Sequence, residues 1–306
     1  MSVVILSVRQ GWHTEELCRA FSERGQQAHV LPYEGLRSHL GRSEPQAASL
    51  ESDGVSVLTA DAVLPRFIPA GSLEQIIYRM DALHWIEDHG VPVINSPRAI
   101  ERSVDKFYTT ALFQEAGLPT PETVVCERAS DAMVAVRAMK DVIIKPIFGS
   151  MGHGMMRVDD PDIALRAVQA LEQIHSVFYV QRAVDHGGRD IRVFVLGGRV
   201  LGAIERLVPR GEWRTNFSRG GTVRVFALPS AWEDLALRAA ATVGADYAGV
   251  DLLPTTGGDV FVLEVNGIPG WEGFQQATGL SVAGAIVDYV LTRKGTKGGG
   301  RDGTAE

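Results

Sequence analysis

Residues 260–270 read Val-Phe-Val-Leu-Glu-Val-Asn-Gly-Ile-Pro-Gly, an apolar run that carries one acid and one amide before a glycine-proline turn. Residues two apart on a strand share a face, so Glu264 and Asn266 point the same way. A hairpin centred on residues 257–258 would set Asp251 opposite Glu264. Oxygen ligands without His or Cys suit Mg²⁺. The alternative is a solvated polar strand face, but charges on a strand of buried type need partners, which favours a metal site.

A second motif is a lysine that ends an apolar strand and precedes a glycine-rich turn. Residues 142–146 read Val-Ile-Ile-Lys-Pro, and residues 148–154 read Phe-Gly-Ser-Met-Gly-His-Gly. Glycines let backbone N–H groups approach phosphate oxygens closely, so Lys145 and this turn are candidates for phosphate binding. A Walker A loop would place its lysine after the glycines, so this is not a P-loop. An ordinary surface hairpin is an equal alternative when the turn is taken alone.

A third group of residues is basic and polar. Arginine forks bind phosphate and carboxylate bidentately, and asparagine adds a neutral donor. Spacing alone favours the alternative, a surface loop with solubilising charge. The group consists of Arg192, Arg206, Arg214, Thr215, Asn216 and Arg219.

Strands and helices alternate in the first 96 residues, which predicts a parallel three-layer α/β domain. Ser72 and Gln75 form a capping box for one of these helices, which should run to about His89. Residues 35–54 are polar and patternless, and we interpret them as a loop. Strands are expected at residues 3–8, 28–31, 55–58, 62–64 and 91–95, and the other helix at 14–24.

The remainder of the chain has a different pattern. Ser96 and Pro97 predict a helix start, and the helical pattern continues to Ala116. Residues 190–196 and 199–207 are typical of a hairpin that turns at two glycines. Further strands are expected at residues 248–253 and 260–265, and further helices at 231–243 and 281–291.

Composition limits the classes of function. A formal net charge of -7 argues against a nucleic-acid binder, which usually has a basic surface. No apolar run reaches the length of a membrane span, and the first residues lack the basic start of a secretory signal. Two cysteines 108 positions apart make a disulfide framework improbable. We therefore expect a cytoplasmic enzyme with no membrane or nucleic-acid partner.

Taken in order along the chain, these motifs resemble the ATP-grasp superfamily, and within it the RimK-type α-L-glutamate ligases, including the branch that acts on tetrahydromethanopterin. The similarity covers residues 55–292 and is strongest around the arginine-rich hairpin and the metal-site strands. It implies an ATP-grasp fold of α/β (α+β) class behind an N-terminal parallel pre-ATP-grasp domain. The implied domains are residues 1–96, 97–187 with the glycine turn, and 188–293 with the Mg²⁺ site, before a disordered tail at 294–306.

The resemblance also implies roles for residues at the nucleotide. Lys106 and Lys145 would contact the ATP phosphates, and Asp190 would lie near the ribose. The glycine turn contributes Gly149, Ser150, Gly152 and Gly154, and the adenine hinge is formed by Gln181, Arg182, Ala183 and Val184. Arg182 departs from the glutamate usual in the family, which questions a side-chain role there.

Further implied roles concern catalysis, metal and substrate. Two Mg²⁺ ions, which Mn²⁺ could replace, would be bound by Asp251, Glu264 and Asn266. The transferred phosphate would be held by Arg214, Thr215 and Asn216, with Arg192 beside them in catalysis. Substrate carboxylates would be placed by Arg66, Arg206 and Arg219. A second departure, Gly267-Ile268 in place of the usual Ala-Ser, lies next to the metal site.

The implied reaction joins a carboxylate to an amine with ATP, through an acyl phosphate, and the implied substrates are glutamate and an acceptor coenzyme, carrier or protein tail. An ATP-grasp kinase or dipeptide-type ligase would share the ATP residues, and a non-catalytic nucleotide-binding module is a third alternative. Family analogy implies a homodimer or tetramer. Aromatic residues that would stack on a pterin ring, or else belong to the core, are Trp12, His13, Tyr78, Trp85 and Trp271.

Overall fold

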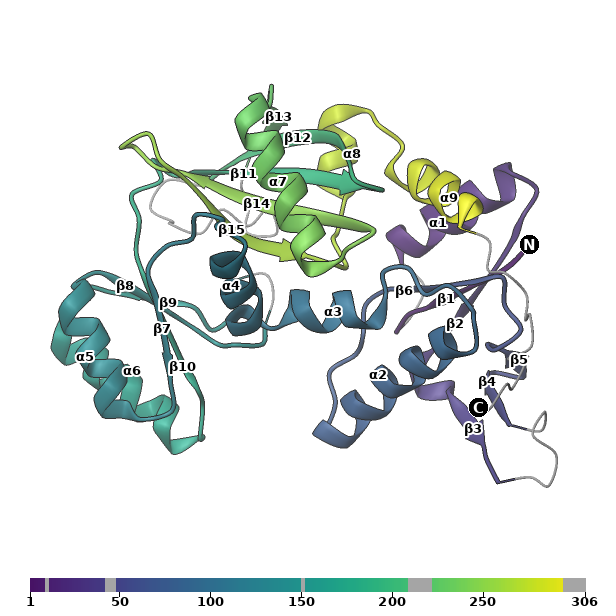
Figure 1. Ribbon diagram of the computed structural model, residues 1–306, viewed down its shortest axis with the longest axis horizontal. Helices are drawn as coiled ribbons and strands as arrows, with labels where there is room; N and C mark the ends of the chain where they lie inside the picture. The colour runs from purple at the N-terminus through teal and green to yellow at the C-terminus, as the bar shows by residue number, and fades with distance from the viewer. Residues whose placement is uncertain (9–10, 42–47, 150–151, 209–221, 294–306) are drawn as a thin grey trace, which may run out of the picture. The chain divides into compact units, whose positions relative to one another are not determined.

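The computed structural model describes residues 1–8, 11–41, 48–149, 152–208 and 222–293 (Figure 1). The chain forms two compact units. Unit 1 comprises residues 1–100, 270–275 and 280–306, and unit 2 comprises residues 101–269 and 276–279. Within the described ranges, no helix has the length and apolar character that a membrane crossing requires. The predicted disordered tail at 294–306 lies outside the described residues.

Unit 1 is built on a parallel sheet of order β2-β1-β6. This sheet confirms the predicted parallel domain, and α1 forms the helical crossover between its strands β1 and β2. Ser72 caps α2 through the backbone N–H of Gln75, as the capping box predicts. The elements are β1 Ser2–Leu6, α1 Trp12–Glu23, β2 Gln27–Leu31, β6 Ala62–Pro65 and α2 Leu73–Asp88.

Two expectations for unit 1 are wrong. The segment 35–54 is not wholly loop, because it contains two strands of a small antiparallel sheet β3-β4-β5. Polar strands of three or four residues give no hydrophobic alternation by which to find them. Residues 91–95 join the main sheet through a single parallel bridge, Val93 to Val63. The elements are η1 Tyr33–Gly35, β3 Arg37–His39, β4 Ser49–Ser52 and β5 Val55–Ser56.

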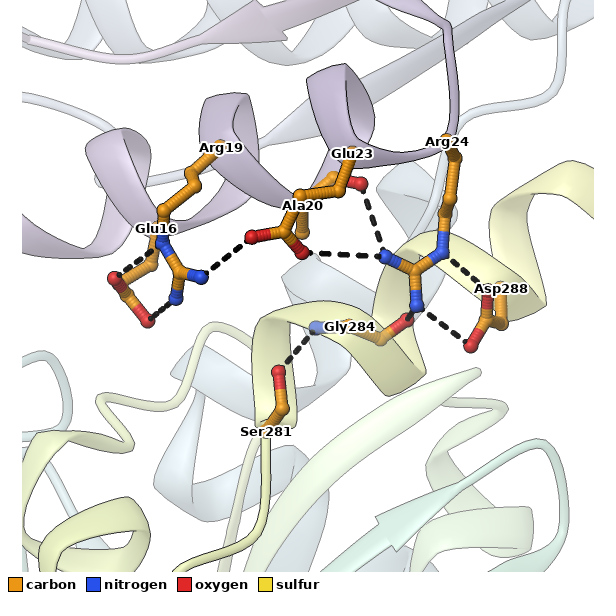
Figure 2. A network of polar contacts seen from close by, with 8 residues as sticks. All are labelled: Glu16, Arg19, Ala20, Glu23, Arg24, Ser281, Gly284 and Asp288. Carbon is orange, nitrogen blue, oxygen red and sulfur yellow. Dashed lines mark hydrogen bonds and ion pairs between the residues drawn. The ribbon is translucent and has the colours of Figure 1, made fainter.

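The C-terminal helix α9 (Val282–Thr292) belongs to unit 1 and packs against α1. Ser281 caps it, and Ile286 and Val290 are among its buried residues. Figure 2 shows the polar contacts beside this packing: the Arg24 guanidinium pairs with Asp288 and donates to the backbone oxygen of Gly284 at 3.2 Å. Helices α1 and α9, far apart in the sequence, therefore pack together in unit 1.

The predicted helix over residues 96–116 is two helices. Ser96 and Pro97 open α3 (Pro97–Val104) as expected, with the Ser96 hydroxyl accepting from the Ala99 N–H. Asp105 then leaves the helical conformation and caps α4 (Lys106–Glu115) by accepting from the Tyr108 N–H at 2.9 Å. The aspartate was the missed signal, since it is a favoured N-cap residue.

Unit 2 contains two antiparallel sheets. The first has the order β7-β10-β8-β9 and packs against α5 and α6. The sequence pattern missed β9, a three-residue strand that lies between the glycine turn and α6. The elements are β7 Thr123–Cys126, α5 Ala129–Met139, β8 Val142–Lys145, β9 Met156–Val158, α6 Pro161–Gln173 and β10 Phe178–Arg182.

The second sheet has the order β13-β12-β11-β14-β15 and packs against α7. The predicted hairpin is confirmed, because Leu196 pairs with Arg199 across the two-residue glycine turn. The elements are β11 Arg189–Leu196, β12 Arg199–Leu207, β13 Thr222–Val225, α7 Ser230–Val243, β14 Tyr247–Pro254, β15 Val260–Asn266 and α8 Glu272–Thr278. Helix α8, which was not predicted, is divided between the units, with residues 272–275 in unit 1 and 276–278 in unit 2.

Candidate functional site

The sheet β7-β10-β8-β9 has one apolar face and one polar face. Side chains alternate between the faces of a strand, and Ile144 and Val180 lie in the core with α5 and α6. Their neighbours Lys145, Tyr179 and Gln181 therefore lie on the opposite face. Tyr179 pairs directly with Lys145 in the register of β10 and β8.

Two lysines approach the glycine turn from different elements. Lys145 is 7% exposed, and its Nζ donates to Gln181 Oε1 at 2.6 Å. Lys106 opens α4, and its Nζ donates to the backbone oxygens of Ile147 at 3.3 Å and Gly149 at 2.9 Å. Lys106 thus contacts the start of the glycine turn itself.

The protonation of these lysines reflects their burial. Burial lowers the pKa of Lys145 to about 8, with Glu264 opposing the shift and Lys106 adding to it. Burial also lowers the pKa of Lys106, which Glu264 and Asp105 partly oppose. Two partly desolvated ammonium groups close together would be stabilised by an anion, because an opposite charge favours the charged form of a lysine.

On the second sheet, charged residues face one another across four neighbouring strands, β12, β11, β14 and β15. Asp190 pairs with Arg206 between β11 and β12, and Arg192 pairs with Asp251 between β11 and β14. Asp251 then pairs with Glu264 of β15. The predicted opposition of Asp251 and Glu264 is confirmed, although a bulge follows Asp251 in this ladder.

Asp251 is held by two arginines. Arg192 Nη2 donates to its Oδ2 at 2.7 Å, and Arg206 Nη2 donates to the same oxygen at 2.8 Å. Arg206 also forms a two-bond pair with Asp190, at 2.7 and 2.5 Å. Burial by itself would raise the pKa of Asp251, but Arg192 and Arg206 hold it far below its usual range. Asp251 is therefore ionised at neutral pH.

Glu264 behaves in the opposite way. Burial and the neighbouring Asp251 charge raise its pKa, and Arg192 and the two lysines only partly oppose them. Within the described part of the chain, its carboxylate has no hydrogen bond or ion pair. Two adjacent carboxylates, one of them unpaired, form a donor set that a divalent cation would stabilise, so these residues fit the implied Mg²⁺.

Asn266 is the third predicted metal ligand, and its side chain also forms a hydrogen bond within the turn that follows β15. It pairs with Gly249 in the β14–β15 ladder, and its Oδ1 accepts from the Ile268 N–H at 3.0 Å. A carbonyl oxygen has a second lone pair, so this turn contact leaves one for a ligand. Among the described residues no cluster of three or more His, Cys, Asp or Glu could hold a metal, so Asn266 remains the third predicted ligand.

The two sheets of unit 2 line one pocket of about 900 Å³, counting the open space at its mouth. Most of the predicted residues that the structure describes line it: Lys106, Lys145, Gly149, Gly152, Gln181, Arg182, Ala183, Val184, Asp190, Arg206, Asp251 and Glu264. Five predicted residues lie outside the described ranges: Ser150, Arg214, Thr215, Asn216 and Arg219.

Some predicted residues have contacts that suggest positioning. The Arg182 guanidinium pairs with Glu122 and donates to the Met139 carbonyl at 3.3 Å. Arginine at this pocket-lining position, in place of the family's usual glutamate, therefore links strand β10 to Glu122 and Met139. Gly154 lies in the sequence between two pocket-lining residues, His153 and Met155. Its backbone has a positive φ of 73°, which favours glycine.

Arg66 lies in unit 1, and its predicted role in placing carboxylates remains a prediction. It is 6% exposed, with its guanidinium 4.5 Å from the centre of the Trp271 ring. Burial and the Arg66 charge lower the pKa of His13 to about 4, and Nε2 of this neutral ring accepts from the backbone N–H of Trp271 at 3.1 Å. Trp271 is fully buried, so it belongs to the core rather than to an exposed stacking surface.

Sequence reasoning missed the apolar wall of the pocket. Ile143 and Leu253 line it, and each lies two residues from a predicted site residue on the same strand. The period of two could have found them, since they share a face with Lys145 and Asp251. Other lining residues are Pro146, His153, Met155, Arg157, His186 and Leu263.

Comparison with known proteins gives relatives along nearly the whole chain. A tetrahydromethanopterin:alpha-L-glutamate ligase of Methanosarcina acetivorans is 31% identical over 309 residues, covering 92% of this chain and 95% of the relative. A probable alpha-L-glutamate ligase of Trichodesmium erythraeum is 31% identical over 294 residues, covering 95% and 96%.

Solved structures share the fold. The ATP-grasp ligase PsnB, in complex with a phosphomimetic variant of its minimal precursor, Mg and ADP, has a TM-score of 0.76 at 20% identity, over 95% of this chain and 98% of that one. A RimK domain ATP-grasp protein from Sphaerobacter thermophilus has a TM-score of 0.71 at 22% identity, over 95% and 100%.

Two family models divide the chain between them. The RimK PreATP-grasp domain matches residues 1–100, and the RimK-like ATP-grasp domain matches residues 103–290. The ATP-grasp model therefore contains every strand that lines the pocket. The chain belongs to the RimK-like ATP-grasp ligase family.

Proposed function

We propose that this protein uses ATP to join L-glutamate to an acceptor through an amide bond, with an acyl phosphate between the two steps. The observation that supports this most is a pocket lined by two lysines, of which Lys145 is buried, and by the adjacent carboxylates of Asp251 and Glu264. Such a pocket suits a nucleotide polyphosphate with a divalent cation. The names of the relatives, which are glutamate ligases, support the choice of glutamate as the substrate.

The reaction needs no nucleophile from the protein. The substrate carboxylate attacks the γ-phosphate, ADP leaves, and the amine then attacks the acyl carbon and displaces phosphate. Lys145 and Lys106 would bind and orient the phosphates, and Ile143 and Leu253 would pack against the base. Arg192 would keep Asp251 ionised and in register for cation binding.

ATP and Mg²⁺ are the cofactors of this proposal, with two ions bound by Asp251, Glu264 and Asn266, and Mn²⁺ able to replace them. Bound there, the cation would neutralise charge on the transferring phosphoryl group. Because ATP is the donor, we place the reaction in the cytoplasm. We also propose a homodimer or homotetramer, by analogy with the family.

For the acceptor, a reduced pterin coenzyme is the first candidate, because full-length relatives bear the tetrahydromethanopterin name. A peptide is the second, because the solved neighbours include ATP-grasp ligases with bound precursor peptides. The latter share less than 25% identity with this chain, so the pterin class ranks higher.

The test is release of ADP from Mg-ATP and L-glutamate, with and without a panel of acceptors: a reduced pterin coenzyme, a deazaflavin coenzyme and acidic-tailed proteins. Mass spectrometry follows the gain of one glutamyl unit. The Glu264→Gln variant provides the background rate, because it loses a proposed cation ligand while keeping nearly the same shape.

Acceptor-dependent ADP release together with a glutamyl gain would support the ligase and identify the acceptor class. A phosphorylated acceptor without the glutamyl gain would mean an ATP-grasp kinase instead. Nucleotide binding with no product from any acceptor would leave a binding module as the better proposal.

A further inference from the structure

We propose that Tyr179 and Thr110 are positioning residues for Lys145. Their hydroxyls orient the Gln181 amide that holds the Lys145 ammonium, and they tie this amide to the first turn of α4, which begins at Lys106. The inference deepens the proposed function, because it rests on Lys145 binding the phosphates of a nucleotide.

The geometry begins with the register of three strands. Tyr179 and Gln181 share one face of β10, where Tyr179 lies opposite Lys145 of β8 and Gln181 lies opposite Thr123 of β7. Lys145 donates to Gln181 Oε1 at 2.6 Å. Gln181 Nε2 donates to Thr123 Oγ1 at 2.9 Å and to the Tyr179 hydroxyl at 3.2 Å. Both the oxygen and the nitrogen of the Gln181 amide are therefore hydrogen-bonded.

The direction of each hydrogen bond follows from chemistry. Thr110 Oγ1 donates to the Lys106 carbonyl at 2.7 Å, because a carbonyl can only accept. Its 2.8 Å contact with the Tyr179 hydroxyl must then have Tyr179 as the donor. The tyrosine oxygen is left to accept from Gln181. Burial raises the pKa of Tyr179, which keeps this donor protonated at neutral pH.

This order fixes which end of the Gln181 amide faces Lys145. Rotation of the amide by half a turn would point its NH₂ group at the ammonium and its oxygen at hydroxyls whose protons are already committed. Without Tyr179 and Thr110, the contact with Thr123 alone would have to prevent that rotation.

The choice of an amide also has a functional consequence. A carboxylate partner would cancel the charge of Lys145, whereas a neutral oxygen orients the ammonium and leaves its charge to interact with phosphate. Because Lys145 is buried, a partner is needed to satisfy one of its donors. The hydroxyl network therefore supports a buried cation without neutralising it.

Binding of Mg-ADP and of adenosine, measured by calorimetry, tests the inference. In Tyr179→Phe and in Thr110→Val we expect Mg-ADP to bind about 5–10-fold more weakly, the usual effect of losing one buried hydrogen bond. Adenosine has no phosphate for Lys145 to hold, so its affinity should not change. The double variant should lose no more than the weaker-binding single variant, because both substitutions break one network.

The matched control is Thr242→Val. Thr242 lies on α7 and donates to the Arg238 carbonyl four residues earlier at 2.8 Å, the same helical contact that Thr110 makes with Lys106. It should bind Mg-ADP like the wild type. Thermal unfolding of every variant shows whether it is folded.

The outcomes separate the inference from the proposed function. If Lys145→Ala leaves Mg-ADP affinity unchanged, the proposed nucleotide site itself is wrong. If Lys145→Ala weakens binding but Tyr179→Phe and Thr110→Val do not, the positioning role is wrong. Equal losses for Mg-ADP and adenosine, or losses that add in the double variant, would also overturn it.

Discussion

Lys145 combines a charge, a neutral partner and burial, and its pKa of about 8 makes it sensitive to pH in an accessible range. Bound phosphate favours the protonated amine and raises that pKa, so binding weakens as pH rises above it. From a pKa of about 8, the protonated fraction falls roughly eightfold between pH 7.5 and pH 9. We expect the ADP dissociation constant, measured by calorimetry without divalent cations, to rise by about that factor.

Lys145→Arg is the control for this pH profile. An arginine stays protonated throughout the range, so its ADP affinity should be nearly flat with pH. A wild-type profile as flat as that of the variant would contradict the role of Lys145.

Glu264 illustrates a side chain that opposes folding and serves function. Its pKa is raised in the folded protein, so above its unfolded pKa the folded state is penalised for keeping the carboxylate ionised. Glu264→Gln should therefore unfold at the same temperature as the metal-free wild type or higher. Turnover should fall at least about 100-fold, because one of the charges that would bind the cation is lost.

Thermal unfolding without metal and ADP release with Mg²⁺ measure the two effects of Glu264→Gln. A variant that is clearly less stable would show that the glutamate is structurally paired. A variant with full turnover would exclude Glu264 from the cation site.

Asp251 should respond in the opposite way, although it faces Glu264 directly. Its pKa is lowered by Arg192 and Arg206, so its ionised form stabilises the folded state. Asp251→Asn would leave the guanidinium groups of Arg192 and of the buried Arg206 partly unpaired, and we expect a loss of about 3–5 kcal/mol in the free energy of unfolding. Urea denaturation compared with Glu264→Gln is the measurement. Equal stability of the two variants would contradict the electrostatic distinction between these carboxylates.

At the scale of elements, the sequence predicted what depends on local periodicity. The two hairpins and the Asp251–Glu264 register follow from glycine turns between apolar strands, and the structure has both. The bulge between Asp251 and Leu252 sets this register, because without it the pairing that starts at the turn would place Leu263, not Glu264, opposite Asp251. The short strands β3 and β9 were missed, since three residues carry too little pattern.

The prediction of site residues was limited in the same way, because it also depended on local sequence pattern. Candidate residues were found where charge interrupts an apolar strand, as at Asp251 and Glu264. The partners of those residues are set by tertiary packing, so the pairing of Arg206 with both Asp190 and Asp251 had no local signal. The resemblance assigned Arg206 to substrate, which stays a prediction; the structure adds its hydrogen bonds to the carboxylates of Asp190 and Asp251.

Helix α9 shows which contacts stabilise an element. Its ion pair to Arg24 is drawn in Figure 2, but the Asp288 side chain is 64% exposed, so solvent screens it. Ile286 is 1% exposed. We expect Asp288→Asn to lower the free energy of unfolding by less than about 1 kcal/mol and Ile286→Ala by about 2–5 kcal/mol. Urea unfolding followed by circular dichroism measures both, and a larger effect of Asp288→Asn would reverse this ranking.

At the scale of the whole molecule, the path of the chain separates its two cores. The chain leaves unit 1 after residue 100, forms unit 2, and returns so that α9 packs on α1. Every residue that lines the pocket belongs to unit 2. A nucleotide bound there stabilises the unit that holds it, by about 2.7 kcal/mol at a concentration 100 times its dissociation constant.

We therefore expect Mg-ADP to slow hydrogen exchange most in β8, β10, β14 and β15, the strands that bring Lys145, Gln181, Asp251 and Glu264 to the pocket. The amides of α1 and α9 should change much less, because their packing lies within unit 1 and contains no pocket residue. Hydrogen exchange with and without Mg-ADP, using Lys145→Ala as the control, makes this measurement. Equal protection in both units would mean that the two cores unfold together, so that nucleotide binding in unit 2 also stabilises α9 in unit 1.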